Sequence, residues 1–126
     1  MKARAEELPV IIQTPSGTIR GLDEGGMTFT LIHVSEGGVD LSPLLAGLPG
    51  NLCPTPHWGY VVEGAAHVRF ADGHEEVAEK GTVFHFEPGH IPTFDAGTTV
   101  IEIGPEPENR QLREHLQHAL RRLLVG

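Results

Sequence analysis

The chain of 126 residues has the length of one domain and is too short to hold two hydrophobic cores. Its 9 Lys and Arg are outnumbered by 17 Asp and Glu. The net charge of −8 argues against nucleic acid and against an anionic membrane surface as partners, because both are bound by basic faces. No apolar run is long enough for a signal peptide or a membrane-spanning helix, and the single cysteine, Cys53, cannot form an intramolecular disulfide. We therefore expect a cytoplasmic protein.

Turn residues divide most of the chain into short segments with the composition of β-strands. The chain has 16 Gly and 10 Pro, many of them between apolar segments, and the turns recur at a spacing of about 8 to 12 residues. Residues 35–56 are irregular, with one helical turn expected at 43–47. This pattern predicts an all-β sandwich or barrel over about residues 9–104. Strands are expected on both sides of a turn at 14–17, and then at 27–34, 58–62, 65–70, 75–78, 82–86, 92–95 and 98–103.

The C-terminal segment differs from the rest because its apolar residues recur at helical spacing. An amphipathic α-helix is expected over residues 108–125, with Arg121 and Arg122 in its last turns and Gly126 as its cap. A long apolar face needs a surface to cover it, so the helix is expected to lie across the barrel or to pair with a second copy in a homodimer. The face consists of Leu112, Leu116, Ala119, Leu120, Leu123 and Leu124.

Two stretches, residues 53–64 and 81–92, resemble the two sequence motifs of the cupin superfamily. Gly64 follows His57 by seven residues, and Gly89 follows Gly81 by eight. Sixteen residues separate Gly64 from Gly81, which is similar to the spacing in small bacterial cupins. The resemblance covers about residues 27–104. It implies an all-β cupin double-stranded β-helix, or jelly-roll barrel, followed here by the C-terminal amphipathic α-helix.

The resemblance also indicates where a metal ion would bind, because cupin motifs direct four side chains at one metal inside the barrel. Asn51, Cys53, His57 and Pro92 occupy these four positions. Cys53 and His57 are strong donors for transition metals, whereas proline has no side-chain donor. His90 lies two residues before Pro92, on the same face of an extended chain, and could replace it. We therefore predict that Cys53, His57 and His90 bind one divalent zinc, iron, nickel or copper ion.

Other interpretations of the same residues stay open. The barrel could lack metal, with its imidazoles only forming hydrogen bonds. Cys53 could act as a nucleophile with His57 as its base, or be a small buried apolar residue. The pocket is predicted to be lined by four further residues, which are Asn51, Tyr60, His85 and Pro92.

The predicted function is binding of a small molecule at this divalent metal site, without nucleic acid or membrane as partner. Such a centre could belong to an enzyme acting on a small organic substrate, and a dioxygenase, an isomerase and a hydrolase are not distinguished. The alternative is a metal-free cupin that binds or senses a small molecule without catalysis. A third class is an interaction protein whose functional surface is the helix face.

Overall fold

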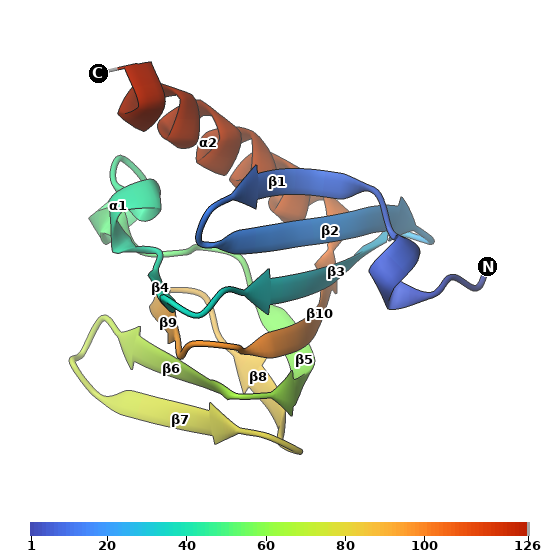
Figure 1. The fold of residues 1–126 in the computed structure, drawn as a ribbon. Helices are drawn as coiled ribbons and strands as arrows, with labels where there is room; N and C mark the ends of the chain where they lie inside the picture. The colour runs from blue at the N-terminus through green and yellow to red at the C-terminus, as the bar shows by residue number, and fades with distance from the viewer. Residues whose placement is uncertain (126) are drawn as a thin grey trace.

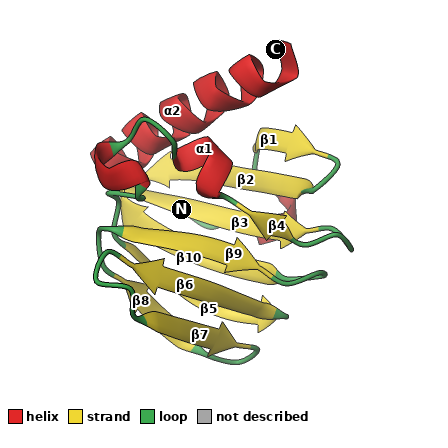
Figure 2. Cartoon of the chain, turned by 90° about the vertical axis from the view of Figure 1, so that its left-hand side faces the viewer, coloured by secondary structure: helices red, strands yellow, loops and turns green. Residues whose placement is uncertain are grey.

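The computed structural model describes residues 1–125 and consists of two facing antiparallel sheets with a long helix over one end (Figures 1 and 2). The strands are β1 (Val10–Thr14), β2 (Gly17–Glu24), β3 (Met27–Val34), β4 (Val39–Asp40), β5 (His57–Glu63), β6 (Ala65–Phe70), β7 (Glu75–Glu79), β8 (Val83–Phe86), β9 (His90–Phe94) and β10 (Thr99–Pro105). The helical elements are η1 (Ala5–Glu7), α1 (Ser42–Leu45), η2 (Pro49–Asn51) and α2 (Glu106–Val125). None of the helices in residues 1–125 has both the length and the apolar character needed to cross a membrane.

The strand order is that of a jelly roll. One sheet has the order β1-β2-β3-β10-β5-β8 and the other the order β4-β9-β6-β7, and every pairing is antiparallel. Strands far apart in sequence are neighbours, since β10 lies between β3 and β5. The predicted all-β fold with a C-terminal helix is confirmed, and the strands lie close to the predicted segments.

Side-chain alternation along the strands decides which residues fill the barrel. On β10, Val100, Glu102 and Gly104 are buried, while Ile101 and Ile103 are only partly buried. The same alternation on the other strands places apolar side chains of both sheets in contact between the layers. The resulting core cluster consists of Ile32, Val34, Val61, Ala66, Val68, Ala78, Phe86, Phe94 and Val100.

Helix α2 begins two residues before the predicted position and covers its apolar face within its own chain. Pro107 fits the first turn, where a backbone N–H would have no helical partner. Leu116 and Ala119 are buried, and Leu112 packs with α1 and β1 side chains in a second core cluster. Leu123 is exposed, whereas the side chain of Leu124 and the predicted cap at Gly126 lie outside the described part. The barrel and α1 thus supply the surface that the helix face requires (Figure 1).

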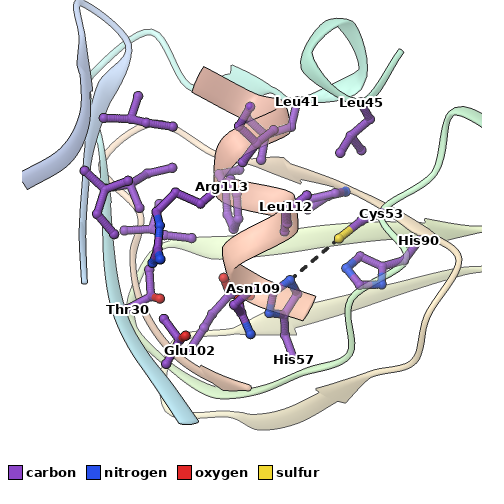
Figure 3. Close-up of a pocket in the computed structure, with 18 residues that line it drawn as sticks. Thr30, Leu41, Leu45, Cys53, His57, His90, Glu102, Asn109, Leu112 and Arg113 are labelled. Atoms are coloured by element: carbon purple, nitrogen blue, oxygen red, sulfur yellow. Dashed lines mark hydrogen bonds between the residues drawn. The ribbon is translucent and has the colours of Figure 1, made fainter. Parts of the chain in front are cut away.

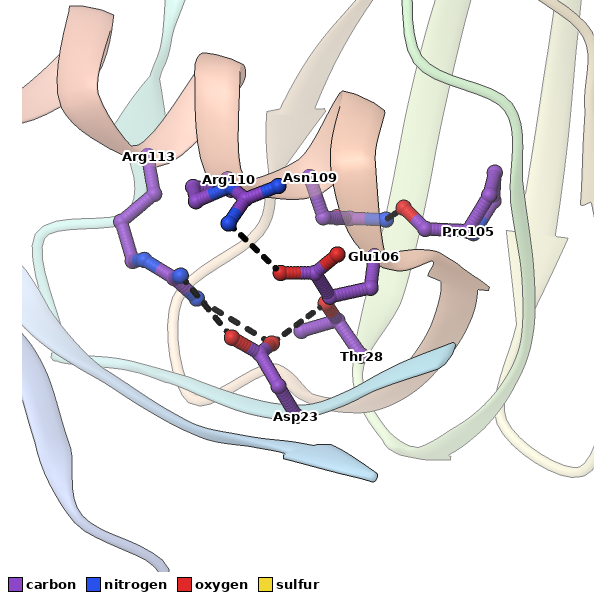
Figure 4. A network of polar contacts seen from close by, with 7 residues as sticks. All are labelled: Asp23, Thr28, Pro105, Glu106, Asn109, Arg110 and Arg113. Atoms are coloured by element: carbon purple, nitrogen blue, oxygen red, sulfur yellow. Dashed lines mark hydrogen bonds and ion pairs between the residues drawn. The ribbon is translucent and has the colours of Figure 1, made fainter. Parts of the chain in front are cut away.

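Polar contacts fasten the first turns of α2 to the β2–β3 hairpin (Figure 4). Two nitrogens of Arg113 donate to the Asp23 carboxylate at 3.4 and 3.1 Å, and the Thr28 hydroxyl donates to it at 2.7 Å. Within the helix, Arg110 pairs with Glu106 at 3.4 Å. The hydrogen bond from Arg113 is the main cause of a lowered pKa of Asp23, with Thr28 adding to it against the effect of burial.

Candidate functional site

A cavity lies inside the barrel below α2, and its walls divide into an apolar and a polar part (Figure 3). Its volume, counted as the space open to the centres of water-sized molecules, is about 80 Å³. This is several times the roughly 10 to 15 Å³ that one buried water needs. The apolar wall includes Ile12, Ile19, Leu45, Phe94, Leu112 and Leu116. The polar wall includes Thr28, Thr30, Glu102, Asn109 and Arg113, together with Cys53, His57 and His90.

The backbone brings the three predicted metal ligands together. Cys53 forms an isolated antiparallel bridge with His90, in which the Cys53 N–H donates to the His90 carbonyl at 2.8 Å. His57 is the first residue of β5, and its side chain points inward like that of Val61. The Cys53 Sγ lies 3.7 Å from the His57 Nε2. One ligand atom from each of Cys53, His57 and His90 lies within 4.8 Å of the other two, and all three residues are buried.

Burial controls the protonation of this group. It lowers the pKa of His57 to about 4, and it also lowers that of His90, although a hydrogen bond to the Glu87 carbonyl acts in the opposite direction. Both imidazoles are therefore neutral near pH 7, as metal ligands must be. Burial raises the pKa of the Cys53 thiol to about 12. The thiol consequently keeps its proton unless a cation stabilises the thiolate.

His90 is held in the tautomer that a metal ligand needs. Its Nδ1 lies 2.6 Å from the carbonyl oxygen of Glu87, which can only accept a hydrogen bond. The proton is therefore on Nδ1, and the lone pair of Nε2 is free. Ligating histidines commonly carry such an outer partner. One sulfur and two nitrogen donors fit a transition metal such as zinc, iron, nickel or copper, so the residues present fit the predicted ion.

Glu102 is the main cavity residue that the sequence analysis missed. Its register places it between Thr30 of β3 and Gly59 of β5, and the residue is only 8% exposed. Burial raises its pKa to about 7, with the charge of His90 acting in the opposite direction. The sequence did contain a signal for Glu102. It lies two residues after the apolar Val100, and alternate residues of a strand point to the same face, so Glu102 could have been placed on the core side. Thr28 and Thr30 on the barrel face of β3 could have been identified from the same alternation.

Helix α2 contributes two further residues that were not predicted. Asn109 is buried, and its Nδ2 donates to the Pro105 carbonyl at 2.9 Å. Arg113 lines the cavity one turn further along while it pairs with Asp23. No sequence pattern pointed to them, since polar residues near the start of an amphipathic helix are usually solvated.

The structure brings Pro92 to the cavity but places Asn51, Tyr60 and His85 elsewhere. Asn51 is exposed, and its Oδ1 accepts a hydrogen bond from the Gly47 N–H at 3.1 Å. Tyr60 points to the outer face, because inward positions on β5 are those of His57 and Val61. His85 is also on the outer face, where its ring stacks on Trp58 with centroids 4.5 Å apart. The pocket expectation is therefore corrected for these three residues.

Comparison with known proteins identifies the fold. No family model matches the sequence, and no curated protein matches it either. An RmlC-like cupin from Shewanella frigidimarina is similar at 20% identity and a TM-score of 0.59, covering 85% of this chain and 92% of that chain. Protein NMB1881 from Neisseria meningitidis is similar at 20% identity and a TM-score of 0.52, over 70% and 82% of the two chains.

A larger enzyme shares the same fold. Hydroxypropylphosphonic acid epoxidase from S. wedmorenis is similar at 13% identity and a TM-score of 0.56, and the match covers 82% of this chain but only 58% of the enzyme. At these identities the likeness concerns the fold, and it agrees with the strand order of the two sheets. This chain therefore has the same fold as these cupins: a jelly-roll barrel with its C-terminal helix over one end.

Proposed function

We propose that Cys53, His57 and His90 bind one divalent transition metal and that this centre binds a small organic molecule in the adjoining cavity. The observation that carries the proposal is the approach of three buried ligand atoms to within 4.8 Å of one another in the wall of the cavity. Three protein ligands leave a coordination position for water or a small molecule. The candidates are zinc, iron, nickel and copper. A solved structure of similar fold at 12% identity, that of HppE, is named as an Fe(II) protein, and its likeness to this chain extends to the fold only.

The bound metal would supply Lewis acidity or oxygen activation. The chain contributes the environment for that chemistry. The Glu87 carbonyl orients His90, and the apolar wall below α2 limits the access of water. Glu102 can hold or release a proton near neutral pH, since its pKa is raised to about 7. Such a site suits a metal-dependent enzyme on a small organic substrate.

A metal-free binding module is the second candidate. The pKa of the Cys53 thiol, raised to about 12, favours this alternative, because a thiol that keeps its proton is a weak metal ligand. In that case the neutral imidazoles of His57 and His90 would serve only as hydrogen-bonding groups in the cavity wall.

Metal analysis distinguishes the two candidates. Protein produced without an affinity tag, in medium supplied with zinc, iron, nickel and copper, is expected to contain about one transition metal per chain. His57→Ala and His90→Ala should lose the metal. His85→Ala is the matched control, because His85 is an exposed strand histidine outside the cavity, and it should keep the metal. Wild-type protein without metal, or equal metal in all four proteins, would refute the metal centre.

We also propose that the protein is a homodimer in the cytoplasm. The location is supported by the buried free thiol of Cys53, because free thiols are typical of reducing compartments. Much of the apolar face of α2 is not available for pairing, because it packs on its own barrel and α1. Exposed apolar side chains gather instead on the outer face of β5 and β8, where Trp58 is 44% and Val83 is 76% exposed. In sedimentation velocity, Val83→Glu should shift the dimer toward monomer, whereas Leu123→Glu on α2 should not.

A further inference from the structure

The carboxyl group of Glu102 faces the cavity without a partner from the protein. The residue is more than nine-tenths buried and lines the cavity. Within residues 1–125 no side chain or backbone N–H donates a hydrogen bond to it, and its oxygens are not sealed in the core. A buried carboxyl without a hydrogen bond is costly, and the cost falls when a ligand supplies the missing donor. Glu102 is therefore placed to recognise part of the bound molecule.

The part of the chain that the structure describes offers no free lysine or arginine to an anion in the cavity. Among these residues, Arg113 is the only Lys or Arg that lines the cavity, and both terminal nitrogens of Arg113 donate to the Asp23 carboxylate. In the chain without a metal, an anionic ligand would thus meet the acidic Glu102 with no free lysine or arginine to balance it. A metal bound by Cys53, His57 and His90 would itself supply positive charge.

The remaining wall and the net charge restrict the ligand further. The apolar wall, with Ile12, Leu45, Phe94 and Leu116 among its residues, can bury a hydrocarbon body. The chain carries a net charge of −8, so its field disfavours the approach of anions and favours cations. A hydrogen-bond donor at one end of an apolar body matches both parts of the cavity (Figure 3).

We infer that the cavity selects a small apolar molecule with one hydrogen-bond-donating head, an amine or an alcohol, and that Glu102 accepts the hydrogen bond from this head. The inference deepens the proposed function, because it names the ligand class of the same cavity. For the chain without a metal, it excludes carboxylates and phosphates as preferred ligands.

A matched set of probes tests the inference on the full chain after treatment with a chelator, so that no metal binds the probes. Benzylamine, benzyl alcohol, benzoate and toluene share one ring and differ in the head group, and their dissociation constants can be measured by NMR titration. At pH 8, Glu102 is mostly ionised, because its pKa is raised to about 7. The amine and the alcohol are then expected to bind at least about tenfold more tightly than benzoate and toluene, because a hydrogen bond to a charged group is worth about one to two powers of ten in affinity.

The Glu102→Gln variant then tests whether Glu102 is the residue that causes the preference for the amine and the alcohol. The substitution keeps the shape and an accepting oxygen but removes the charge, so benzylamine should lose about tenfold in affinity while benzyl alcohol loses less. Glu63→Gln is the control, since Glu63 is an exposed acid paired with Lys80 at 2.9 Å, and no probe should change. If Glu102→Gln does not fold, the ranking of the probes on wild-type protein decides.

The inference is overturned if benzoate binds as tightly as benzylamine, if Glu102→Gln leaves the ranking unchanged, or if none of the four probes binds at millimolar concentration. The metal content of the same samples is measured before and after treatment with a chelator. Protein that holds no metal before the chelator is added, yet shows the expected probe ranking, would refute the metal centre and support the role of Glu102. Protein that holds metal before the chelator is added, but shows the reversed ranking after it, would do the opposite.

Discussion

The inner and outer faces of the β5–β8 pair carry similar residues in opposite environments. His57 on β5 points inward, is buried, and has its Nε2 3.7 Å from the Cys53 sulfur. His85 on β8 points outward, stacks on Trp58 and is exposed. Both are strand histidines next to aromatic residues in the sequence, and the two strands are direct neighbours in the sheet. A shift of one residue in register would exchange their environments. Side-chain direction, rather than residue type, makes one imidazole a candidate ligand and the other a surface group.

The largest expected effect comes from filling the inner face of β5. A side chain at Gly59 would collide with the carbonyl oxygen of Ile101 and with the ring of Phe84. Gly59→Val is expected to lower the free energy of unfolding by about 3 kcal/mol or more, measured by urea denaturation. Gly37→Ala is the matched control, because an added Cβ there would meet no atom within 4 Å. A Gly59→Val variant as stable as wild type would show that the inner face can accommodate a larger side chain by small shifts of its neighbours.

The next effect compares two valines on the two faces. Val61 on β5 is fully buried between the sheets, whereas Val83 on β8 is exposed. Val61→Ala should lower the free energy of unfolding by about 2 kcal/mol, from lost burial and the cavity left behind. Val83→Ala, measured in the same denaturation experiment at a concentration where the chain is monomeric, should change it by less than about 0.5 kcal/mol. Equal losses would mean that the outer face is also packed in the monomer.

Acid pH should separate the two histidines. The pKa of His57 falls to about 4 in the folded chain, below the ordinary value of 6.5, so its neutral form is favoured by folding. This contribution is present above pH 6.5 and is lost as the pH falls toward 4, because the unfolded chain then binds the proton first. In chelator-treated protein, the loss of stability between pH 7 and pH 5 should be smaller in His57→Gln than in wild type by about 2 kcal/mol.

His85→Gln is the control for this measurement and should follow the wild-type pH dependence. Glu102 has the opposite trend, since its raised pKa favours the folded chain at low pH and this contribution is lost as the pH rises toward about 7. Each variant is therefore compared with wild type at the same pH, where the contribution of Glu102 cancels. Parallel curves for His57→Gln and wild type would contradict burial as the cause of the lowered pKa.

The smallest effect concerns the polar contacts that fasten α2. The pKa of Asp23 is lowered by Arg113 and Thr28, so the stability it adds is present above about pH 4 and is lost at lower pH. The ion pair is partly exposed, and Asp23→Asn should therefore lower the free energy of unfolding at pH 7 by only about 0.5 kcal/mol, with a smaller difference at pH 3. Thermal denaturation at both pH values measures this. A larger loss would indicate that the contact closes the cavity as well as fastening the helix.

The sequence by itself was sufficient for the fold. Turn residues and strand composition predicted the β segments, because turn geometry depends on local residues. The cupin barrel was implied by the resemblance of residues 53–64 and 81–92 to the two cupin motifs. The match to the cupin motifs also identified Cys53, His57 and His90 as candidate ligands. The structure places the ligand atoms of these three residues within 4.8 Å of one another, and whether they hold a metal stays a prediction.

Only the tertiary structure decided the rest of the cavity. Tyr60 and His85 were expected inside but lie outside, and Glu102 was overlooked although it faces the ligand space. The direction of a strand side chain depends on which face meets the opposite sheet, and that is set by pairing between residues distant in the chain, such as Thr30, Glu102 and Gly59. The covering of the α2 face by the barrel has the same origin, because it depends on contacts across more than half of the sequence.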